Sequence, residues 1–123
     1  MKRPLVCVFL FGLLTPTAWA DTACEVERLL GFIEKSQCTF VRNGYKYDAA
    51  DARAHIQRKY DYIEDRVETT EQVIKYAATE SSMSGEPYSV ICSGLEEPSA
   101  DWLIRKLARI RAASECKRAR STR

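Results

Sequence analysis

The chain has 123 residues, and its 19 lysines and arginines against 17 acidic residues give a formal net charge of +2. This length suits one domain with a modest core. A single histidine and five cysteines without a Cys-x-x-Cys pair argue against a structural zinc site, so we expect neither a metal nor another cofactor.

Residues 1–20 follow the pattern of a secretory signal peptide. They start with basic residues, continue with an apolar run over residues 5–14 and end in "AWA", so we expect cleavage before Asp21. The apolar run is shorter than the roughly 20 residues that span a bilayer. The sequence therefore predicts a soluble domain that is exported to the periplasm.

Hydrophobic spacing and turn residues predict a helix, a hairpin and a second helix in the first half of the mature chain. Apolar residues recur at helical spacing over residues 25–36. In "CTFVRNGYKY", Asn43-Gly44 lies between strand-favouring residues and indicates a tight hairpin turn. Asp48 is a suitable N-cap for a helix that we expect to continue to about residue 67.

The second half is expected to contain two more helices and one strand. Thr69 and Gln72 have the spacing of a capping box at the start of a third helix, which ends in the loop "SSMSGEPY". A short strand follows at residues 88–92, and "SGLEEP" after it is expected to be a loop. Ser99 is the expected N-cap of the last helix.

These elements predict one α+β domain over residues 21–116. A small antiparallel sheet, formed by the hairpin plus one strand, is expected to pack against three or four helices. Residues 117–123 have no apolar periodicity, so we expect a basic, disordered tail.

Four cysteines remain once Cys7 leaves with the expected signal peptide. An even number in a small exported domain indicates two disulfides, for which three connectivities exist. Cys38 and Cys92 lie at the ends of predicted strands, and Cys24 and Cys116 lie at the outer ends of the first and last helices. We therefore favour the pairs 38–92 and 24–116.

The loop "SSMSGEPY" raises the question of a reactive serine. Ser82 or Ser84, with His55 as the base, would make a small serine hydrolase. No Gly-x-Ser-x-Gly motif is present, and none of the loop serines is part of a Ser-x-x-Lys motif. A turn whose serines bond the local backbone, with Gly85 at a positive φ, explains the same residues. The hydrolase therefore stays an alternative.

A second hypothesis is an anion-binding site formed by Arg42, His55 and Lys59. His55 and Lys59 lie one turn apart on the same face of the second helix. Arg42 would pair with a carboxylate or phosphate, and the serine loop would add hydrogen bonds. The competing interpretation is a solvated arginine, a solvated lysine and a histidine at the edge of the core.

The C-terminal region offers a third hypothesis. Residues 105–123 carry eight lysines and arginines and one acid, Glu115. Such a region would attract anionic lipid headgroups or lipopolysaccharide and hold the protein at the envelope surface. The same positive charge would also bind nucleic acid, but the exported location argues against a nucleic-acid partner. A solubilising tail without a partner is the competing interpretation.

Three segments, "CTFVRNGYKYDAADARAHIQRKY", "SSMSGEPYSV" and "DWLIRKL", resemble the YfeK-like family of small exported proteobacterial proteins of unknown function. The resemblance covers about residues 29–107 and does not include Cys24 or Cys116. It implies no reaction, ligand or partner. It does imply that the family signature includes Arg42, Asn43, Gly44, His55, Lys59, Ser81, Ser82, Ser84, Gly85, Tyr88 and Trp102.

The sequence thus favours a periplasmic binding or accessory module over an enzyme, because many polar residues occur without a complete catalytic set. Its partner would be an envelope ligand or an envelope protein. The candidate ligand-binding residues are Arg42, Asn43, His55, Lys59, Ser82, Ser84 and Tyr88.

Overall fold

The computed structural model describes residues 18–117, so most of the expected signal peptide and nearly all of the expected tail lie outside the described residues. The helices are α1 (Ala18–Ser36), α2 (Ala49–Ile63), the 3-10 helix η1 (Glu64–Arg66), α3 (Thr70–Ala77) and α4 (Ser99–Ala112). The strands are β1 (Thr39–Arg42), β2 (Tyr45–Tyr47), β3 (Ser89–Cys92) and β4 (Leu95–Pro98). The predicted α+β class is confirmed.

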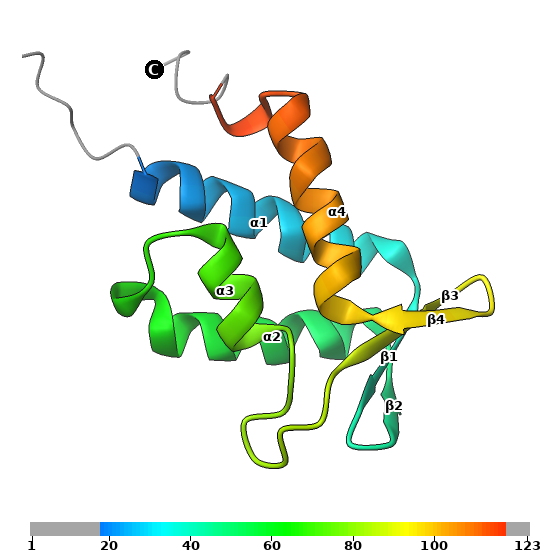
Figure 1. Cartoon of the computed structure of the whole chain (residues 1–123). Helices are drawn as coiled ribbons and strands as arrows, with labels where there is room; N and C mark the ends of the chain where they lie inside the picture. The colour runs from blue at the N-terminus through cyan, green and yellow to red at the C-terminus, as the bar shows by residue number, and fades with distance from the viewer. Residues whose placement is uncertain (1–17, 118–123) are drawn as a thin grey trace, which may run out of the picture.

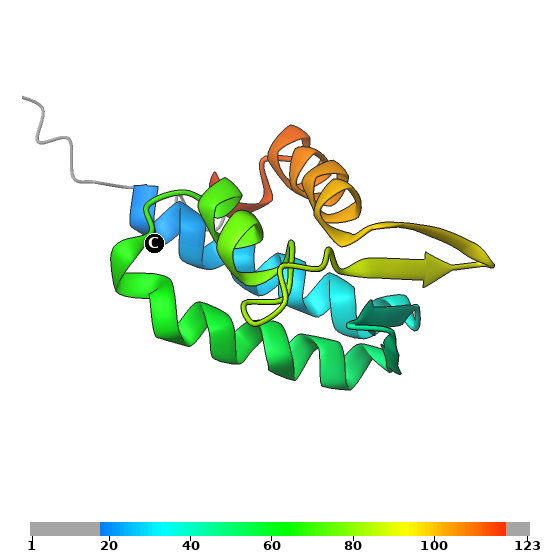
Figure 2. The same ribbon diagram turned by 60° about the horizontal axis from the view of Figure 1, so that its bottom comes forward.

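The helices pack against one another, and the sheet lies at one end of the helical part (Figure 1). Figure 2 shows α1 and α2 side by side along most of their length, with the sheet near the end of α1 and the start of α2. Hairpin β3–β4 projects beyond the helices in both views. No helix of the described part is long and apolar enough to cross a membrane.

The sheet has four antiparallel strands in the order β2-β1-β3-β4. Two hairpins therefore lie side by side and pair through β1 and β3. Both hairpins turn through two residues with positive φ, at Asn43-Gly44 (51° and 78°) and at Ser93-Gly94 (52° and 80°). This conformation suits the right-handed twist of the flanking strands.

Strand β4 corrects the expected loop at "SGLEEP". The segment contains three residues with low strand propensity, Glu96, Glu97 and Pro98, so its sequence did not predict a strand. The structure pairs Glu97 with Val90, and it places Pro98 on an edge strand, where the missing amide N–H costs no ladder hydrogen bond. The sheet therefore has one strand more than predicted.

The capping predictions are confirmed at two helices and wrong at a third. The Asp48 side chain accepts from the Asp51 amide at 2.8 Å, and Thr69 forms the expected capping box with Gln72. Ser99 does not cap α4, whose N-cap is Pro98. Instead Ser99 is buried, and its hydroxyl donates to the Ala78 carbonyl at 3.0 Å, which joins α4 to the end of α3.

Two helix boundaries also differ from expectation. α1 begins at Ala18 rather than near residue 25, because the sequence pattern assigned its first residues to the expected signal peptide. α2 ends at Ile63 and gives way to η1 before the buried Val67.

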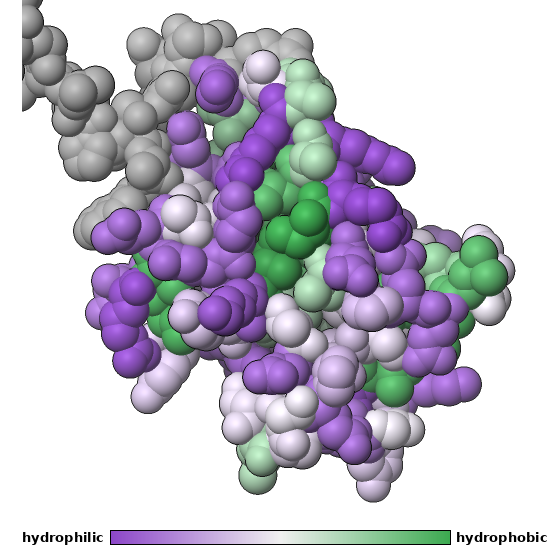
Figure 3. Space-filling model, in the orientation of Figure 1, coloured by the Kyte–Doolittle hydropathy of each residue, from purple (hydrophilic) through white to green (hydrophobic). Residues whose placement is uncertain are grey.

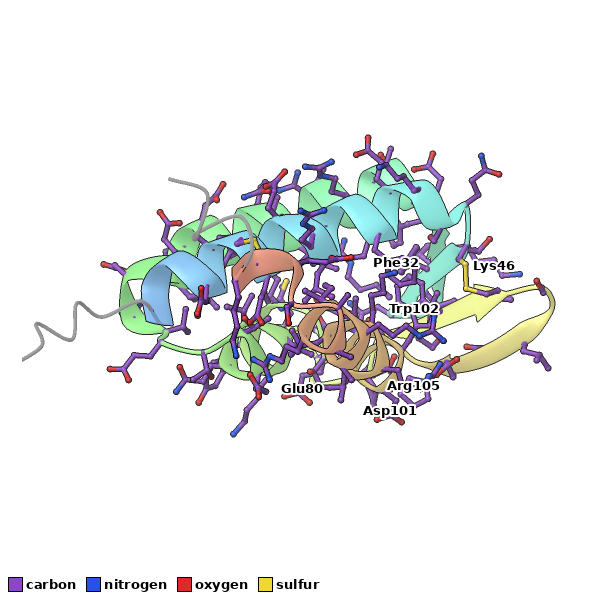
Figure 4. All side chains as sticks on the ribbon, turned by 90° about the horizontal axis from the view of Figure 1, so that it is seen from above. Phe32, Lys46, Glu80, Asp101, Trp102 and Arg105 are labelled. Carbon is purple, nitrogen blue, oxygen red and sulfur yellow. A yellow bond between two sulfur atoms is a disulfide. The ribbon has the colours of Figure 1, made fainter. Side chains whose placement is uncertain are left out.

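Trp102 on α4 joins the helices to the sheet in the core. Its ring lies 4.6 Å from the Phe32 ring on α1 and 5.6 Å from the Phe40 ring on β1, measured between centroids. Figure 4 shows Phe32 and Trp102 next to each other, with Asp101 and Arg105 pointing outward from α4. A strip of hydrophobic surface near α3 and α4, bordered by hydrophilic residues, is visible in Figure 3.

Both favoured disulfides are present. Cys24–Cys116 joins α1 to the turn that follows α4, across 92 residues of sequence. Cys38–Cys92 links the residue before β1 to the end of β3, across 54 residues. They hold the two ends of the domain together and fix the pairing of the two central strands.

Candidate functional site

A hollow of about 250 Å³ lies between hairpin β1–β2 and helix α2. Polar and apolar side chains line it together. The lining residues are Phe40, Val41, Arg42, Tyr47, Asp51, Ala52, Ala54, His55, Ile56, Arg58, Tyr88 and Ser99. Three of the candidate residues, Arg42, His55 and Tyr88, therefore meet at one place.

Arg42 is the last residue of β1, and it reaches across to α2. Its Nη1 lies 2.9 Å from Nδ1 and 3.1 Å from Nε2 of His55. Its Nη2 donates to the Tyr47 hydroxyl at 3.2 Å. Strand alternation explains the direction, since Arg42 shares a face of the sheet with Phe40, which is buried against the helices.

His55 and Lys59 follow one another along α2, and both contact Tyr88. The Tyr88 hydroxyl lies 3.0 Å from Nε2 of His55 and accepts from the Lys59 ammonium at 3.3 Å. Lys59 also donates to the Glu80 carbonyl at 3.1 Å. Tyr88 itself is 7% exposed, so its hydroxyl is held inside this group of side chains.

Burial, together with the positive charges in this site, keeps His55 neutral. Burial first, and then the charges of Arg42, Lys59 and Arg58, lower the pKa of His55 to about 4. Burial and Arg42 also lower the pKa of Lys59, while Glu80 acts in the opposite direction. Burial raises the pKa of Tyr88. At neutral pH the site therefore combines fixed cations with an uncharged imidazole and an uncharged phenol.

The donors in the site determine the imidazole tautomer. Arg42 and Lys59 can only donate, and Arg42 lies closest to Nδ1 of His55. We therefore assign the tautomer in which Nδ1 accepts and Nε2 donates its proton to Tyr88. The Tyr88 oxygen then accepts from both His55 and Lys59. In this tautomer neither His55 nor Lys59 accepts the hydrogen of the Tyr88 hydroxyl.

The cations of the site also lack carboxylate partners. Within residues 18–117, no salt bridge includes Arg42, Arg58 or Lys59. Elsewhere on the described surface, Arg53 and Arg105 each pair with a glutamate. The site thus has an excess of positive charge and of hydrogen-bond donors.

The serine loop lies beside this site and is tied to the first hairpin through Asn43. The Asn43 amide donates to the Ser81 hydroxyl at 3.2 Å, and the Ser84 hydroxyl donates to the Asn43 side-chain oxygen. Ser81 also accepts from two amides of its own loop, and Gly85 has a φ of 73°. The turn interpretation therefore explains Ser81, Ser84 and Gly85.

The serine hydrolase receives no support from this geometry. Within the described part of the chain, no serine hydroxyl lies within hydrogen-bonding distance of His55, whose nitrogens face Arg42 and Tyr88. Ser82 is exposed and makes no side-chain hydrogen bond there. No group of three potential metal-binding side chains occurs among residues 18–117 either.

Tyr47 and Arg58 are two of the lining residues that sequence reasoning did not include among the candidates. Tyr47 lies in the strand that pairs with the strand of Arg42, and Arg58 follows His55 by three positions on α2, so both were visible as neighbours of candidate residues. Asn43 positions the loop and is not part of the lining.

Two arginines of the basic C-terminal region already have partners. Arg105 pairs with Glu97, and Arg111 pairs with Glu25 and Glu71. Three of the six remaining lysines and arginines, at positions 118, 120 and 123, lie outside the described residues. Contact of this region with an anionic membrane therefore stays a prediction.

Comparison with known proteins gives two matches. Residues 20–111 match a family of unknown function, DUF5329. Uncharacterized protein YfeK of Salmonella typhimurium is 36% identical over 93 residues, which cover 72% of this chain and 77% of that protein. No solved structure matches the chain significantly.

Proposed function

The chain belongs to the DUF5329 family of unknown function, and we propose that it is a periplasmic binding module that holds a small anion between hairpin β1–β2 and helix α2. The two disulfides are consistent with export to an oxidising compartment. Signal cleavage before Asp21 is part of this proposal.

One observation carries the proposal. Arg42 and Lys59 are partly buried, Arg58 lies at the same hollow, and none of the three pairs with a carboxylate among the described residues. Charges withdrawn from water are normally paired, because desolvation is costly. An anion from solution would supply the missing partner.

Each residue has a distinct role in this proposal. The Arg42 guanidinium has five N–H donors, and its contacts with His55 and Tyr47 leave donors over for a ligand. Lys59 donates to the Tyr88 hydroxyl and adds a second positive charge to the site. His55 orients Arg42 and Tyr88, and it stays neutral because its pKa is about 4.

The test is an NMR titration of the oxidised mature protein with sodium acetate and, separately, sodium phosphate, at constant ionic strength. We expect saturable shifts of the Arg42, His55 and Tyr88 signals in the wild-type protein. Arg42→Ala should abolish them, and Arg42→Lys should weaken them, because an ammonium lacks the planar fork that matches a carboxylate.

The matched control is Arg105→Ala, which removes an exposed arginine that already pairs with Glu97. Binding should persist in this variant. Shifts that fail to saturate, or that have the same size in Arg42→Ala and in the wild-type protein, would show that there is no anion site at Arg42.

A further inference from the structure

We propose that the ligand is a small monocarboxylic acid with a short apolar tail, whose carboxylate lies at Arg42 and Tyr88 and whose tail lies between β1 and α2. This inference rests on the anion site proposed above. It adds the chemical class of the ligand, which follows from three properties of the hollow: its donors, its apolar wall and its size.

The donors favour a carboxylate. Arg42 offers guanidinium N–H groups, and in the tautomer assigned above Tyr88 offers its hydroxyl hydrogen while its oxygen accepts from His55 and Lys59. A carboxylate has two oxygens and takes a donor on each. Arg42 and Tyr88 both contact His55, so they can approach the two oxygens of a single group.

The local charge favours a single negative charge. Three cations, Arg42, Arg58 and Lys59, lie around His55 and act on its pKa. Two acids lie nearby, since Asp51 lines the hollow and Glu80 acts on Lys59. One positive charge is left over, which matches a monocarboxylate better than a phosphate dianion.

The remaining wall favours an apolar tail. Its apolar lining residues are Phe40 on the sheet side and Ala52, Ala54 and Ile56 on the helix side. The two alanines leave the space that a longer side chain would fill. A purely polar ligand would leave this wall in contact with water, so an alkyl or aryl group is the better complement.

The volume limits the size of the tail. The hollow of about 250 Å³ corresponds to about eight water volumes of ~30 Å³ each. A carboxylic acid with about eight to ten non-hydrogen atoms fits this space, whereas a nucleotide or a diacyl lipid does not. Hexanoate is a suitable probe, with acetate and 1-hexanol as its headgroup-only and tail-only counterparts.

The test is to compare the affinities of the mature protein for these three probes by isothermal titration calorimetry. Each buried methylene should tighten binding about fourfold, so hexanoate should bind up to about 200-fold tighter than acetate. Hexanol should not bind measurably. Tyr88→Phe keeps the ring but removes the hydroxyl donor, and it should weaken hexanoate about tenfold.

Ala54→Leu probes the tail alone, because it fills the hollow from an exposed position of α2. It should weaken hexanoate and leave acetate unchanged, while Ala108→Leu, at an exposed position of α4, should change neither. Equal affinities for acetate and hexanoate, both lost in Arg42→Ala, would overturn the inference but keep the anion site. Binding of both acids unaffected by Arg42→Ala would overturn both proposals.

Discussion

The Tyr88 hydroxyl lies 3.0 Å from Nε2 of His55, so a residue just before β3 and a residue on α2 meet at one hydrogen bond. The segment that contains Tyr88 also leads from the serine loop into the sheet, since the Tyr88 amide donates to the Thr79 carbonyl at 2.8 Å. The site and the loop are therefore positioned by the same stretch of chain.

The first prediction concerns the pH dependence of stability. His55 has a pKa of about 4 in the folded protein against 6.5 as its ordinary value. Between these values the unfolded chain binds the proton more readily, so stability is present above about pH 6.5 and is lost as the pH falls towards 4. Urea midpoints measured from about pH 7.5 down to about pH 4.5 should fall steeply in the wild-type protein.

His55→Gln is the control, because glutamine keeps hydrogen-bonding groups but does not titrate in this range. Its urea midpoint should depend less on pH than that of the wild-type protein over the same window. Parallel pH profiles for the two proteins would mean that the low pKa of His55 does not contribute to stability.

The second prediction concerns the link between the serine loop and hairpin β1–β2. Asn43→Gly preserves the positive φ at this position but removes the side chain that bonds Ser81 and Ser84. Amide hydrogen exchange in the loop should then accelerate, most clearly at Gly85, whose N–H donates to the Ser81 carbonyl. The amides of β3 serve as the internal reference and should stay protected. Unchanged exchange at Gly85 would show that the loop holds its shape without Asn43.

Local signals explain why much of the fold was predictable from the sequence. The capping box at Thr69, the Asp48 cap and the Asn43-Gly44 turn each depend on residues a few positions apart. Strand β4 was missed because its residues disfavour strands and form one only through pairing with β3.

The candidate site was also predictable only in part, because some of its contacts depend on the packing of segments that are distant in sequence. Residues four positions apart lie on one face of any α-helix, so the spacing of His55 and Lys59 was enough to predict that they are neighbours. Arg42 contacts both His55 and Tyr47. This arrangement depends on how hairpin β1–β2 packs against α2. Ser82 resembled its neighbours in sequence, but it is exposed, and the hydrogen bonds of the turn are made by Ser81 and Ser84.

The third prediction concerns the disulfide that joins the two ends of the domain. Replacing Cys24 and Cys116 by alanine should lower the free energy of unfolding by about 4 kcal/mol, because the disulfide closes a loop of 92 residues in the unfolded chain. Urea denaturation of the oxidised variant measures this loss. The Cys38 and Cys92 double variant should lose a similar amount, because the entropy of loop closure depends only weakly on the loop of 54 residues. A variant without Cys24–Cys116 that unfolds at the wild-type midpoint would contradict this account.

The fourth prediction concerns Arg111, which joins α4 to α1 and α3. Its Nε donates to Glu25 at 3.0 Å, and its two other nitrogens donate to Glu71 at 2.8 Å. The Glu25 side chain is only 9% exposed and otherwise accepts from the Thr70 hydroxyl. Arg111→Met would leave a nearly buried carboxylate without its cation, which should cost about 2 kcal/mol, at the lower end for a buried pair because Arg111 itself is half exposed.

A double-mutant cycle separates this charge effect from lost packing. Adding Glu25→Gln to Arg111→Met removes the unpaired charge while the amide oxygen still accepts from Thr70, so the double variant should be more stable than Arg111→Met alone. Arg105→Met removes a solvent-accessible ion pair between α4 and β4 and should leave the urea midpoint nearly unchanged. If Glu25→Gln lowers stability equally with and without Arg111, the two residues are not coupled, and the packing of α1 against α4 must be attributed to the apolar core and to the Cys24–Cys116 disulfide.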